Sequence, residues 1–338
     1  MMPVREELKA YAAKLGFPDS ATMGAIFAIL YGDEDSVKLA AALPGSITEL
    51  ARKTDWPEAK VKSVIGKLKQ NGSIQRVLSK GDYYRLYPAM IELRDSAVLS
   101  PDAPGELFRL WEHLIVKEMP ALVMAFQDMN LPPVMRVVPI EETVTAQNRI
   151  LDIDSARKLF KEAELITAIP CPCRTQAKQV GRGKNCPAPE SAVCMQINGF
   201  AAAIIDRGIG QQLTTADALK RIGDAEDAGL VHQIRNNVKK DMFMCNCCAC
   251  CCTGLYLIHE VGYKSAIAPS RFRVRFDASL CTECGICADR CQFHAIRSNG
   301  TISVDPDKCY GCGNCVKTCP VNALMLEEIR PESFIRIT

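Results

Sequence analysis

The spacing of apolar residues in the amino-terminal third predicts two helices followed by two short strands. Ser46 is a favourable N-cap for the first helix, and Glu49 at the third helical position completes a capping box. A second helix is predicted over 57–70, because apolar residues recur there at helical spacing. Strands over 73–78 and 83–87 follow, joined by a polar hairpin tip. This segment is therefore predicted to form a helix–turn–helix unit that ends in a hairpin.

The middle of the chain alternates between helical and strand patterns, which is typical of an α/β domain. Asp154 or Ser155 is the expected N-cap of one helix, and Thr214 or Thr215 is that of another. Pro120 is expected to break or kink the first helix of this region. The predicted helices are 103–129, 155–164, 191–207, 216–228 and 255–262, and the predicted strands are 135–140, 165–169 and 230–234.

The chain of 338 residues is long enough for several domains, and 48% of its residues are hydrophobic, so each domain can have its own core. Three are predicted. A helical domain occupies 1–95, and an α/β domain with its own cysteines occupies 96–268. A second cysteine-rich domain occupies 269–338, after the linker Ala268-Pro269-Ser270. The predicted fold class is α+β and multi-domain.

The order helix, turn, helix and hairpin resembles the winged-helix family, which often reads DNA through its second helix. Residues 46–90 contain nine Lys and Arg against four Asp and Glu, a local excess of +5 that suits contact with phosphate. That helix offers few base-reading side chains, however. Docking to a partner protein or formation of a homodimer is therefore the favoured interpretation, and DNA binding is the alternative. The positive charges on the exposed side of the second helix are Lys60, Lys62, Lys67 and Lys69.

Eight cysteines near the carboxyl terminus form two strings, each spaced Cys-x2-Cys-x2-Cys-x3-Cys. This spacing resembles that of the bacterial two-cluster ferredoxins. In that family, three thiolates of one string and the fourth thiolate of the other hold each [4Fe-4S] cluster. Zinc is the alternative metal, but zinc sites use paired CxxC knuckles rather than two strings of four. By position, the resemblance implies that Cys281, Cys284, Cys287 and Cys319 hold the first cluster and that Cys309, Cys312, Cys315 and Cys291 hold the second.

One position departs from the ferredoxin pattern. Pro320 follows the last cysteine of the second string, as in the family, whereas Gln292 follows Cys291. The change removes no metal ligand. Its expected effect is on the turn and on the reduction potential of the second cluster.

Ten further cysteines form two sets outside the ferredoxin segment. Neighbouring side chains in an extended segment point in opposite directions, so the second set cannot face one metal without tight turns. Three interpretations are open. The two sets together hold two further iron–sulfur clusters, or they hold one cluster with surplus thiols, or the second set forms a zinc site or a disulfide switch. The first set is Cys171, Cys173, Cys186 and Cys194, and the second is Cys245, Cys247, Cys248, Cys250, Cys251 and Cys252.

The 18 cysteines also bear on the compartment. The chain begins with charged residues and lacks the apolar segment of a secretory signal, so a cytoplasmic protein is expected, with metal rather than disulfides as the use of its thiols. No apolar stretch approaches the roughly 20 residues of a membrane span. The formal charge of +2 does not argue for a nucleic-acid partner, because each bound cluster with its four thiolates adds about −2.

The sequence carries no nucleotide-binding glycine motif and no nucleophile motif, so no catalytic residue is predicted. The whole chain resembles multi-domain 4Fe-4S binding proteins of anaerobes. The predicted function is the relay of low-potential single electrons between donor and acceptor oxidoreductases of anaerobic metabolism. Two alternatives remain. One is a winged-helix transcription regulator whose cluster senses redox state or iron, and the other is an oxidoreductase with a substrate-binding cluster in the middle domain. His232 is a further candidate ligand, although a packed histidine is the commoner role.

Overall fold

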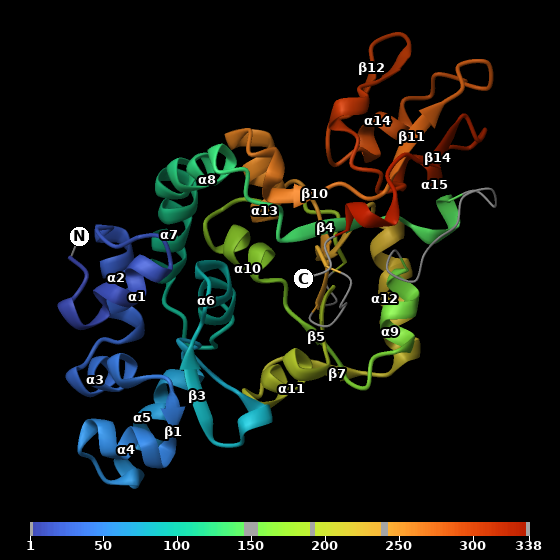
Figure 1. The fold of residues 1–338 in the computed structure, drawn as a ribbon. Helices are drawn as coiled ribbons and strands as arrows, with labels where there is room; N and C mark the ends of the chain where they lie inside the picture. Colours follow the sequence, from blue (N-terminus) through green and yellow to red (C-terminus); the bar gives the residue numbers. More distant parts are fainter. Residues whose placement is uncertain (1–2, 145–154, 190–192, 238–242, 336–338) are drawn as a thin grey trace. The chain divides into compact units, whose positions relative to one another are not determined.

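The computed structural model describes residues 3–144, 155–189, 193–237 and 243–335. The chain forms two compact units, whose helices and strands are labelled in Figure 1. The middle of the chain contributes to both of them. The first unit comprises Met1–Ala125, Pro172–Lys184 and Ala202–Ile209, and the second comprises Phe126–Cys171, Asn185–Ala201 and Gly210–Thr338. The division into three domains, 1–95, 96–268 and 269–338, remains a prediction.

The first unit is mainly helical. Trp111 and Arg94 are among its largest fully buried side chains. The predicted helix 103–129 is interrupted by a π-helical turn, Leu114–Glu118, which ends two residues before Pro120. Proline lacks an N–H and crowds the carbonyl four residues earlier, which favours such a local widening of the helix. Besides α4 and α5, described below, its helices are α1 (Lys9–Lys14), α2 (Ala21–Leu30), α3 (Glu34–Ala42), α6 (Met90–Ala97), α7 (Gly105–His113), α8 (Met119–Asp128), α10 (Pro172–Gln179) and α11 (Asn198–Asp206). Helices α8 and α11 each have some of their residues in the second unit.

The predicted helix–turn–helix segment has the expected order of elements. The capping box is present, because Glu49 N donates to the Ser46 hydroxyl at 3.2 Å and Ser46 N donates to the Glu49 carboxylate at 2.7 Å. The assignment of this segment to the winged-helix family remains a prediction. Its elements are α4 (Ile47–Thr54), α5 (Glu58–Gln70) and a three-stranded sheet in the order β1 (Gly45–Ser46), β3 (Tyr83–Leu86), β2 (Ile74–Arg76).

The second unit is built on a seven-stranded sheet. Among the strands that the structure describes, only the pair β10–β4 is parallel, and the other neighbours are antiparallel. An α/β domain, by contrast, has a mainly parallel sheet. The strand order is β10 (Ile267–Ala268), β4 (Met135–Val138), β8 (Val231–Arg235), β9 (Phe243–Cys247), β6 (Cys194–Ile197), β5 (Ile166–Ile169) and β7 (Gln211–Leu213).

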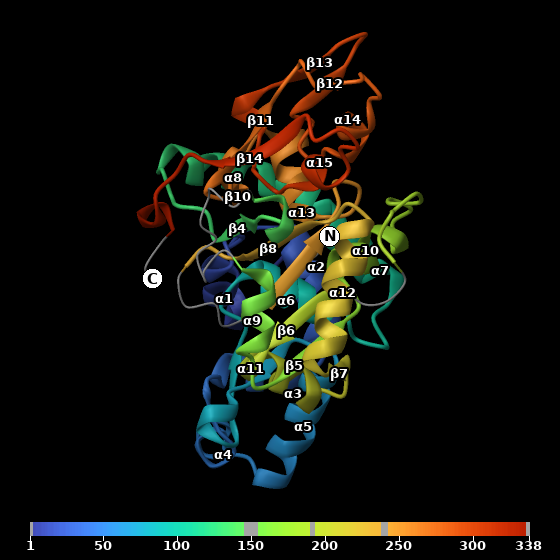
Figure 2. The ribbon, with the colours of Figure 1, turned by 90° about the vertical axis from the view of Figure 1, so that its right-hand side faces the viewer.

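The two faces of this sheet pack against different partners. Helices α9 (Ala156–Lys161) and α12 (Thr215–Asp227) lie side by side on one face (Figures 1 and 2). Along β9, Met244 packs into the core under these helices, whereas Cys247 packs into a separate core on the other face. Side chains alternate along a strand, so Cys245 shares the face of Cys247. The sheet therefore presents two of the predicted metal-binding thiols on the face opposite α9 and α12.

The ferredoxin-like segment consists of two similar halves. Equivalent cysteines of the halves lie 28 positions apart, as with Cys281 and Cys309. Two short antiparallel sheets and two short helices form it. These are β11 (Phe272–Phe276) with β14 (Leu324–Glu328), β12 (Ile296–Ser298) with β13 (Ile302–Val304), α14 (Ile286–Arg290) and α15 (Asn314–Lys317).

Several predicted elements differ from those observed. The predicted helix 191–207 is wrong in its first part, because Cys194–Ile197 forms β6, which pairs with β5, and α11 begins only at Asn198. Asn198 has a left-handed backbone, with φ of 51°, and its side chain accepts hydrogen bonds from the chain at Glu164 and Leu165. Ser191 lies outside the described residues.

Two of the expected caps are resolved. Ser155 caps α9 by accepting a hydrogen bond from Lys158 N at 2.9 Å, and Asp154 lies outside the described residues. Thr214 rather than Thr215 caps α12. The helix predicted over 255–262 begins earlier, as α13 (Thr253–Tyr256), and continues as a π-helical turn, Leu257–Val261.

Candidate iron–sulfur and metal sites

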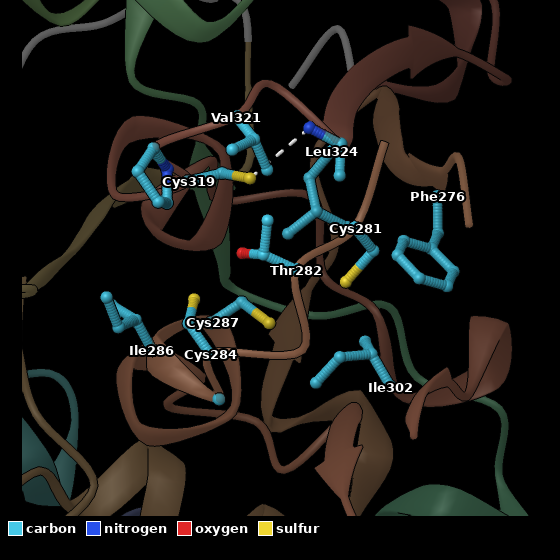
Figure 3. Close-up of a pocket in the computed structure, with 13 residues that line it drawn as sticks. Phe276, Cys281, Thr282, Cys284, Ile286, Cys287, Ile302, Cys319, Val321 and Leu324 are labelled. Atoms are coloured by element: carbon cyan, nitrogen blue, oxygen red, sulfur yellow. Dashed lines mark hydrogen bonds between the residues drawn. The ribbon is translucent and has the colours of Figure 1, made fainter. Parts of the chain in front are cut away.

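The cysteines of the first predicted cluster face one common space. Three of them come from the loop before α14 and from α14 itself, and the fourth follows α15. The surrounding side chains are apolar, which keeps water away from a cluster and so tunes its potential. Figure 3 shows Cys281, Cys284, Cys287 and Cys319 around this space, which Phe276, Ile286, Ile302 and Leu324 also line.

Backbone N–H groups donate to cysteine sulfurs at matching positions of the two halves. Ala295 N donates to Cys291 Sγ at 3.2 Å. Ala323 N donates to Cys319 Sγ at 3.3 Å, the dashed line in Figure 3. Glu283 N also donates to a sulfur, that of Cys281, at 3.3 Å. Hydrogen bonds to the sulfurs are one of the features that set the reduction potential of a bound iron–sulfur cluster, so these donors are placed to tune it.

Left-handed residues bend both cysteine loops. In the first loop they are Glu283 and Gly285, with φ of 58° and 77°, and in the second they are Gly311 and Gly313, with φ of 64° and 89°. A Cβ on Gly311 would lie 2.1 Å from the carbonyl oxygen of Phe272, so only glycine fits there. The local backbone of each loop thus turns three closely spaced cysteines toward one side.

The two sets of predicted cluster ligands differ in burial. The first ferredoxin group is Cys281, Cys284, Cys287 and Cys319, and the second ferredoxin group is Cys291, Cys309, Cys312 and Cys315. Cys284 is exposed, and its neighbours Leu280 and Ile286 are 48% and 42% exposed. In the second group, burial raises the pKa of Cys312 to about 12 and also raises the pKa of Cys309 and Cys315. Buried thiols of this kind ionise when a metal cation replaces their protons. The eight thiols fit two [4Fe-4S] clusters, while the assignment of individual ligands remains a prediction.

Gln292, the departure from the ferredoxin pattern, connects the second ferredoxin group to the middle cysteines. Its side-chain oxygen accepts a hydrogen bond from Ala249 N at 2.8 Å, and its side-chain amide donates to Gly229 O at 3.2 Å. Its own carbonyl oxygen lies 2.9 Å from His259 Nε2. A proline could make neither side-chain hydrogen bond. The residue therefore joins two cysteine loops that lie far apart in sequence.

An aromatic pair covers the same junction. The rings of Phe293 and Tyr310 stack with their centroids 4.2 Å apart, and the Tyr310 hydroxyl donates to Lys264 O at 3.0 Å. Both rings share a hydrophobic core with Cys247 and Cys252. No motif in the sequence points to either ring. The one signal is a difference between the halves, since the positions equivalent to Phe293 and Tyr310 hold Val321 and Thr282.

Four of the ten middle cysteines form one compact group. Their sulfur atoms all lie within 4.8 Å of one another. Hydrogen bonds among these thiols raise the pKa of Cys248, with Cys186 as the main partner, and also raise the pKa of Cys251. This four-thiol group consists of Cys186 from the first predicted set and Cys248, Cys250 and Cys251 from the second.

A second, three-thiol group lies on the face of the sheet opposite α9 and α12. Hydrogen bonds with Cys245 and Cys252, together with burial, raise the pKa of Cys247. Cys247 and Cys252 are buried in a core that also contacts Cys291 and Cys312 of the second ferredoxin group. The run of cysteines after Phe243 thus divides between two groups. The remaining middle cysteines lie elsewhere: Cys171 directly precedes α10, Cys173 lies in α10 and Cys194 is buried in β6.

A buried arginine that no sequence motif indicates contacts Cys173. Arg94 is fully buried in α6 and donates to Cys173 Sγ at 3.2 Å. It also forms an ion pair with Asp95 at 2.5 Å. The Cys173 sulfur is thus held by a charged hydrogen-bond donor within the first unit.

His232 is a packed histidine in this structure. It is 1% exposed, its Nδ1 lies 2.6 Å from Asn246 Oδ1, and its Nε2 lies 3.4 Å from Glu226 Oε1. Glu226 also pairs with Arg157 at 3.2 Å and with Lys317 at 3.0 Å. Burial alone would raise the pKa of Glu226, but the hydrogen bonds from His232 and Lys317 outweigh it and hold the pKa at about 2. Since Lys317 lies between two predicted cluster ligands, this charge network ties α15 to α12 and β8.

The lysines of α5 that suggested DNA contact have carboxylate partners. Surface pairs of this kind contribute little to stability, but they reduce the positive field that a phosphate backbone would meet. The four pairs are Lys60 with Asp35 at 2.8 Å, Lys62 with Glu58 at 3.7 Å, Lys67 with Asp33, and Lys69 with Asp206 at 3.0 Å.

A family model described as the 4Fe-4S binding domain matches residues 274–297 and 302–325. These two segments contain all eight cysteines of the ferredoxin strings. The carboxyl-terminal part of the chain therefore carries two 4Fe-4S binding motifs. No curated protein and no solved structure matches the chain. Within the described ranges, each helix is too short or too polar to cross a membrane.

Proposed function

We propose that this protein is an iron–sulfur electron carrier that relays single low-potential electrons between a donor and an acceptor oxidoreductase in anaerobic metabolism. The observation that carries the proposal is the repeated cysteine loop with its N–H donors to sulfur, in two segments that match the 4Fe-4S binding domain. When bound, such clusters supply one-electron transfer, with potentials set by charge, hydrogen bonds to sulfur and exposure.

The exposed edge around Cys284 is the place where we expect a redox partner to approach. Leu280 and Ile286 offer partly exposed apolar contact beside this thiol. Apolar residues around a partner site favour the brief docking that electron transfer requires. The same exposure lets oxygen reach this group, which supports an anaerobic setting. We propose that the first unit serves as a docking or dimer module. The lysines of α5 are already paired with carboxylates, which favours a protein partner over DNA.

We further propose an additional iron–sulfur site at the three-thiol group. It shares a hydrophobic core with Cys291 and Cys312, so the route for electrons would continue toward the sheet. In a Cys252→Ser variant, iron and sulfide should fall together while the signals of the ferredoxin clusters persist. Loss of neither iron nor sulfide in that variant would remove this part of the proposal.

The three-thiol group also favours a second candidate function. A [4Fe-4S] cluster held by Cys245, Cys247 and Cys252 alone would leave one iron without a cysteine, which is where a substrate could bind. The protein would then be an oxidoreductase. A change in the electron paramagnetic resonance (EPR) spectrum on addition of substrate would support this candidate over a simple carrier.

Voltammetry of the anaerobic protein adsorbed on an electrode tests the primary proposal. We expect reversible one-electron waves at a potential on the order of −400 mV, the value of low-potential ferredoxins. A protein without reversible waves in that range would not be a low-potential electron carrier.

A further inference from the structure

The four-thiol group unites cysteines from two separate segments of the second unit. Cys186 lies in the loop before β6, and the other three lie in the loop between β9 and α13. The sulfur of Cys248 lies 3.4 Å from that of Cys186 and 3.0 Å from that of Cys250. The sulfurs of Cys250 and Cys251 are 3.7 Å apart.

A tight turn explains how three nearly adjacent thiols face one point. Cys251 N and Cys252 N both donate to Cys248 O, at 3.4 and 3.1 Å. Cys248 and Cys251 thereby form a C-x2-C knuckle, the unit on which tetrahedral metal sites are built. Cys250 lies within the knuckle. Cys252 is the N-cap of the next helix, α13, and belongs to the three-thiol group.

The separation of the sulfur atoms indicates how many metal ions the group can hold. In a tetrahedral site with metal–sulfur bonds of about 2.3 Å, the sulfurs lie about 3.8 Å apart. A [4Fe-4S] cluster binds each thiolate through a different iron, which holds the four sulfurs farther apart. The ferredoxin thiols serve as an internal comparison. All eight lie in the described part of the chain, and there only the four-thiol group has its sulfurs within 4.8 Å of one another.

We propose that Cys186, Cys248, Cys250 and Cys251 bind one tetrahedral thiophilic metal ion, zinc or iron, and not a [4Fe-4S] cluster. Four thiolates are the donor set that soft-metal sites of this geometry use. The site is separate from the ferredoxin clusters, so it stands whether or not the proposed electron-carrier function holds.

The ion would fix the loop that carries both middle groups. Ala249, inside the knuckle, donates its N–H to the Gln292 side-chain oxygen at 2.8 Å, so the knuckle is hydrogen-bonded to the residue after Cys291. A bound ion would therefore fix the position of the three-thiol group relative to the second ferredoxin group. Zinc would do this without redox chemistry, and iron would add a one-electron centre.

Metal and sulfide analysis of the full-length protein, purified without oxygen, tests the proposal. The variants are Cys186→Ser and Cys250→Ser, and the matched control is Ala249→Ser, which changes the knuckle but keeps all four thiols. We expect each cysteine variant to lose about one equivalent of zinc or iron, with sulfide unchanged, and the control to keep its metal. Because Cys250 is exposed, its replacement should leave the fold intact.

Two results would overturn the proposal. Parallel loss of about four iron and four sulfide would identify a cluster, and unchanged metal in both cysteine variants would leave only a thiol pair or a disulfide switch. Spectroscopy of the wild-type holoprotein gives an independent reading. Zinc should show only sulfur neighbours in X-ray absorption, or iron should show the Mössbauer signal of a single tetrathiolate ion, distinct from cluster iron.

Discussion

Gln292 shows how one side chain can join two metal-binding regions. In the other half of the ferredoxin segment its place is taken by Pro320, which is exposed. Gln292 instead donates to Gly229 O and accepts from Ala249 N, so it bonds the second ferredoxin group to the four-thiol loop. A net hydrogen bond contributes about 0.5–1.5 kcal/mol, so the pair is a measurable part of the stability of this junction.

Restoring the family residue at this position should weaken the protein. We expect Gln292→Pro to lower the free energy of unfolding by about 1–3 kcal/mol, because both side-chain hydrogen bonds are lost. Iron in the ferredoxin clusters should be unchanged. Denaturant unfolding without oxygen measures the effect, and Pro320→Gln is the control, with an expected change below about 1 kcal/mol. Equal effects of the two variants would show that Gln292 does not bond the two loops.

Glu226 gives the structure a defined dependence on pH. Its pKa of about 2 lies below the value of about 4.3 for an unfolded glutamate, so its ion pairs stabilise the fold fully above that value. The contribution is lost as the pH falls from about 4.3 toward 2. We expect Glu226→Gln to lower the free energy of unfolding by about 2–3 kcal/mol at pH 7, because it leaves His232, Arg157 and Lys317 without their carboxylate.

The comparison of wild-type and variant unfolding at pH 7 and at pH 4 checks this expectation. The difference in free energy should shrink at the lower pH. Glu142→Gln is a matched control, since Glu142 also pairs with Lys317 at 3.0 Å but its side chain is 56% exposed, and its effect should stay within about 0.5 kcal/mol. A difference that does not change with pH would contradict the role of the Glu226 charge.

At the scale of elements, the two cysteine loops of the ferredoxin segment follow one plan in different surroundings. Gly285 and Gly313 occupy equivalent left-handed positions. A Cβ on Gly285 would approach only the Ser298 hydroxyl, at 3.3 Å, whereas a Cβ on Gly313 would lie 2.3 Å from the Thr143 hydroxyl. Thr143 cannot yield easily, because its hydroxyl donates to Ile140 O at 2.6 Å. The second loop is therefore held by the rest of the second unit.

This asymmetry predicts different effects for equivalent substitutions. Gly285→Ala should lower the free energy of unfolding by about 1 kcal/mol, the cost of a left-handed alanine. Gly313→Ala adds a steric clash and should lower it by more than about 2 kcal/mol, with loss of cluster iron. Anaerobic unfolding and iron analysis of the two variants make the test. A Gly285 variant as unstable as the Gly313 variant would contradict the packing of the second loop.

Local signals in the sequence predicted some elements well and missed others for physical reasons. The capping box at Ser46 depends on residues within one turn, and it forms as predicted. The strand at Cys194 was predicted as a helix, because its pairing with β5 comes from a segment 25 residues away. The division of the cysteine run into two groups could be anticipated from the alternation of side chains, but the partner Cys186 could not. The spacing of cysteines in the sequence does not tell which distant loop lies against the turn at Cys248–Cys251.

At the scale of the whole molecule, the cysteines of the second unit form a series of adjoining groups. The first ferredoxin group lies beside exposed apolar residues, and the second shares a core with the three-thiol group on the sheet. The loop of the four-thiol group is connected to the second ferredoxin group by the hydrogen bond from Ala249 to Gln292. The arrangement accounts for 15 of the 18 cysteines, because the ferredoxin strings hold eight, the four-thiol group four and the three-thiol group three.

The measurement that tests the central claim most directly is low-temperature EPR of the anaerobic, dithionite-reduced protein, with iron and sulfide determined on the same sample. We predict at least about 8 iron and 8 sulfide per chain, and a signal from two reduced clusters that integrates to about two spins. A reduced protein without such a signal, and with fewer than about 4 iron per chain, would show that the ferredoxin strings do not hold two [4Fe-4S] clusters.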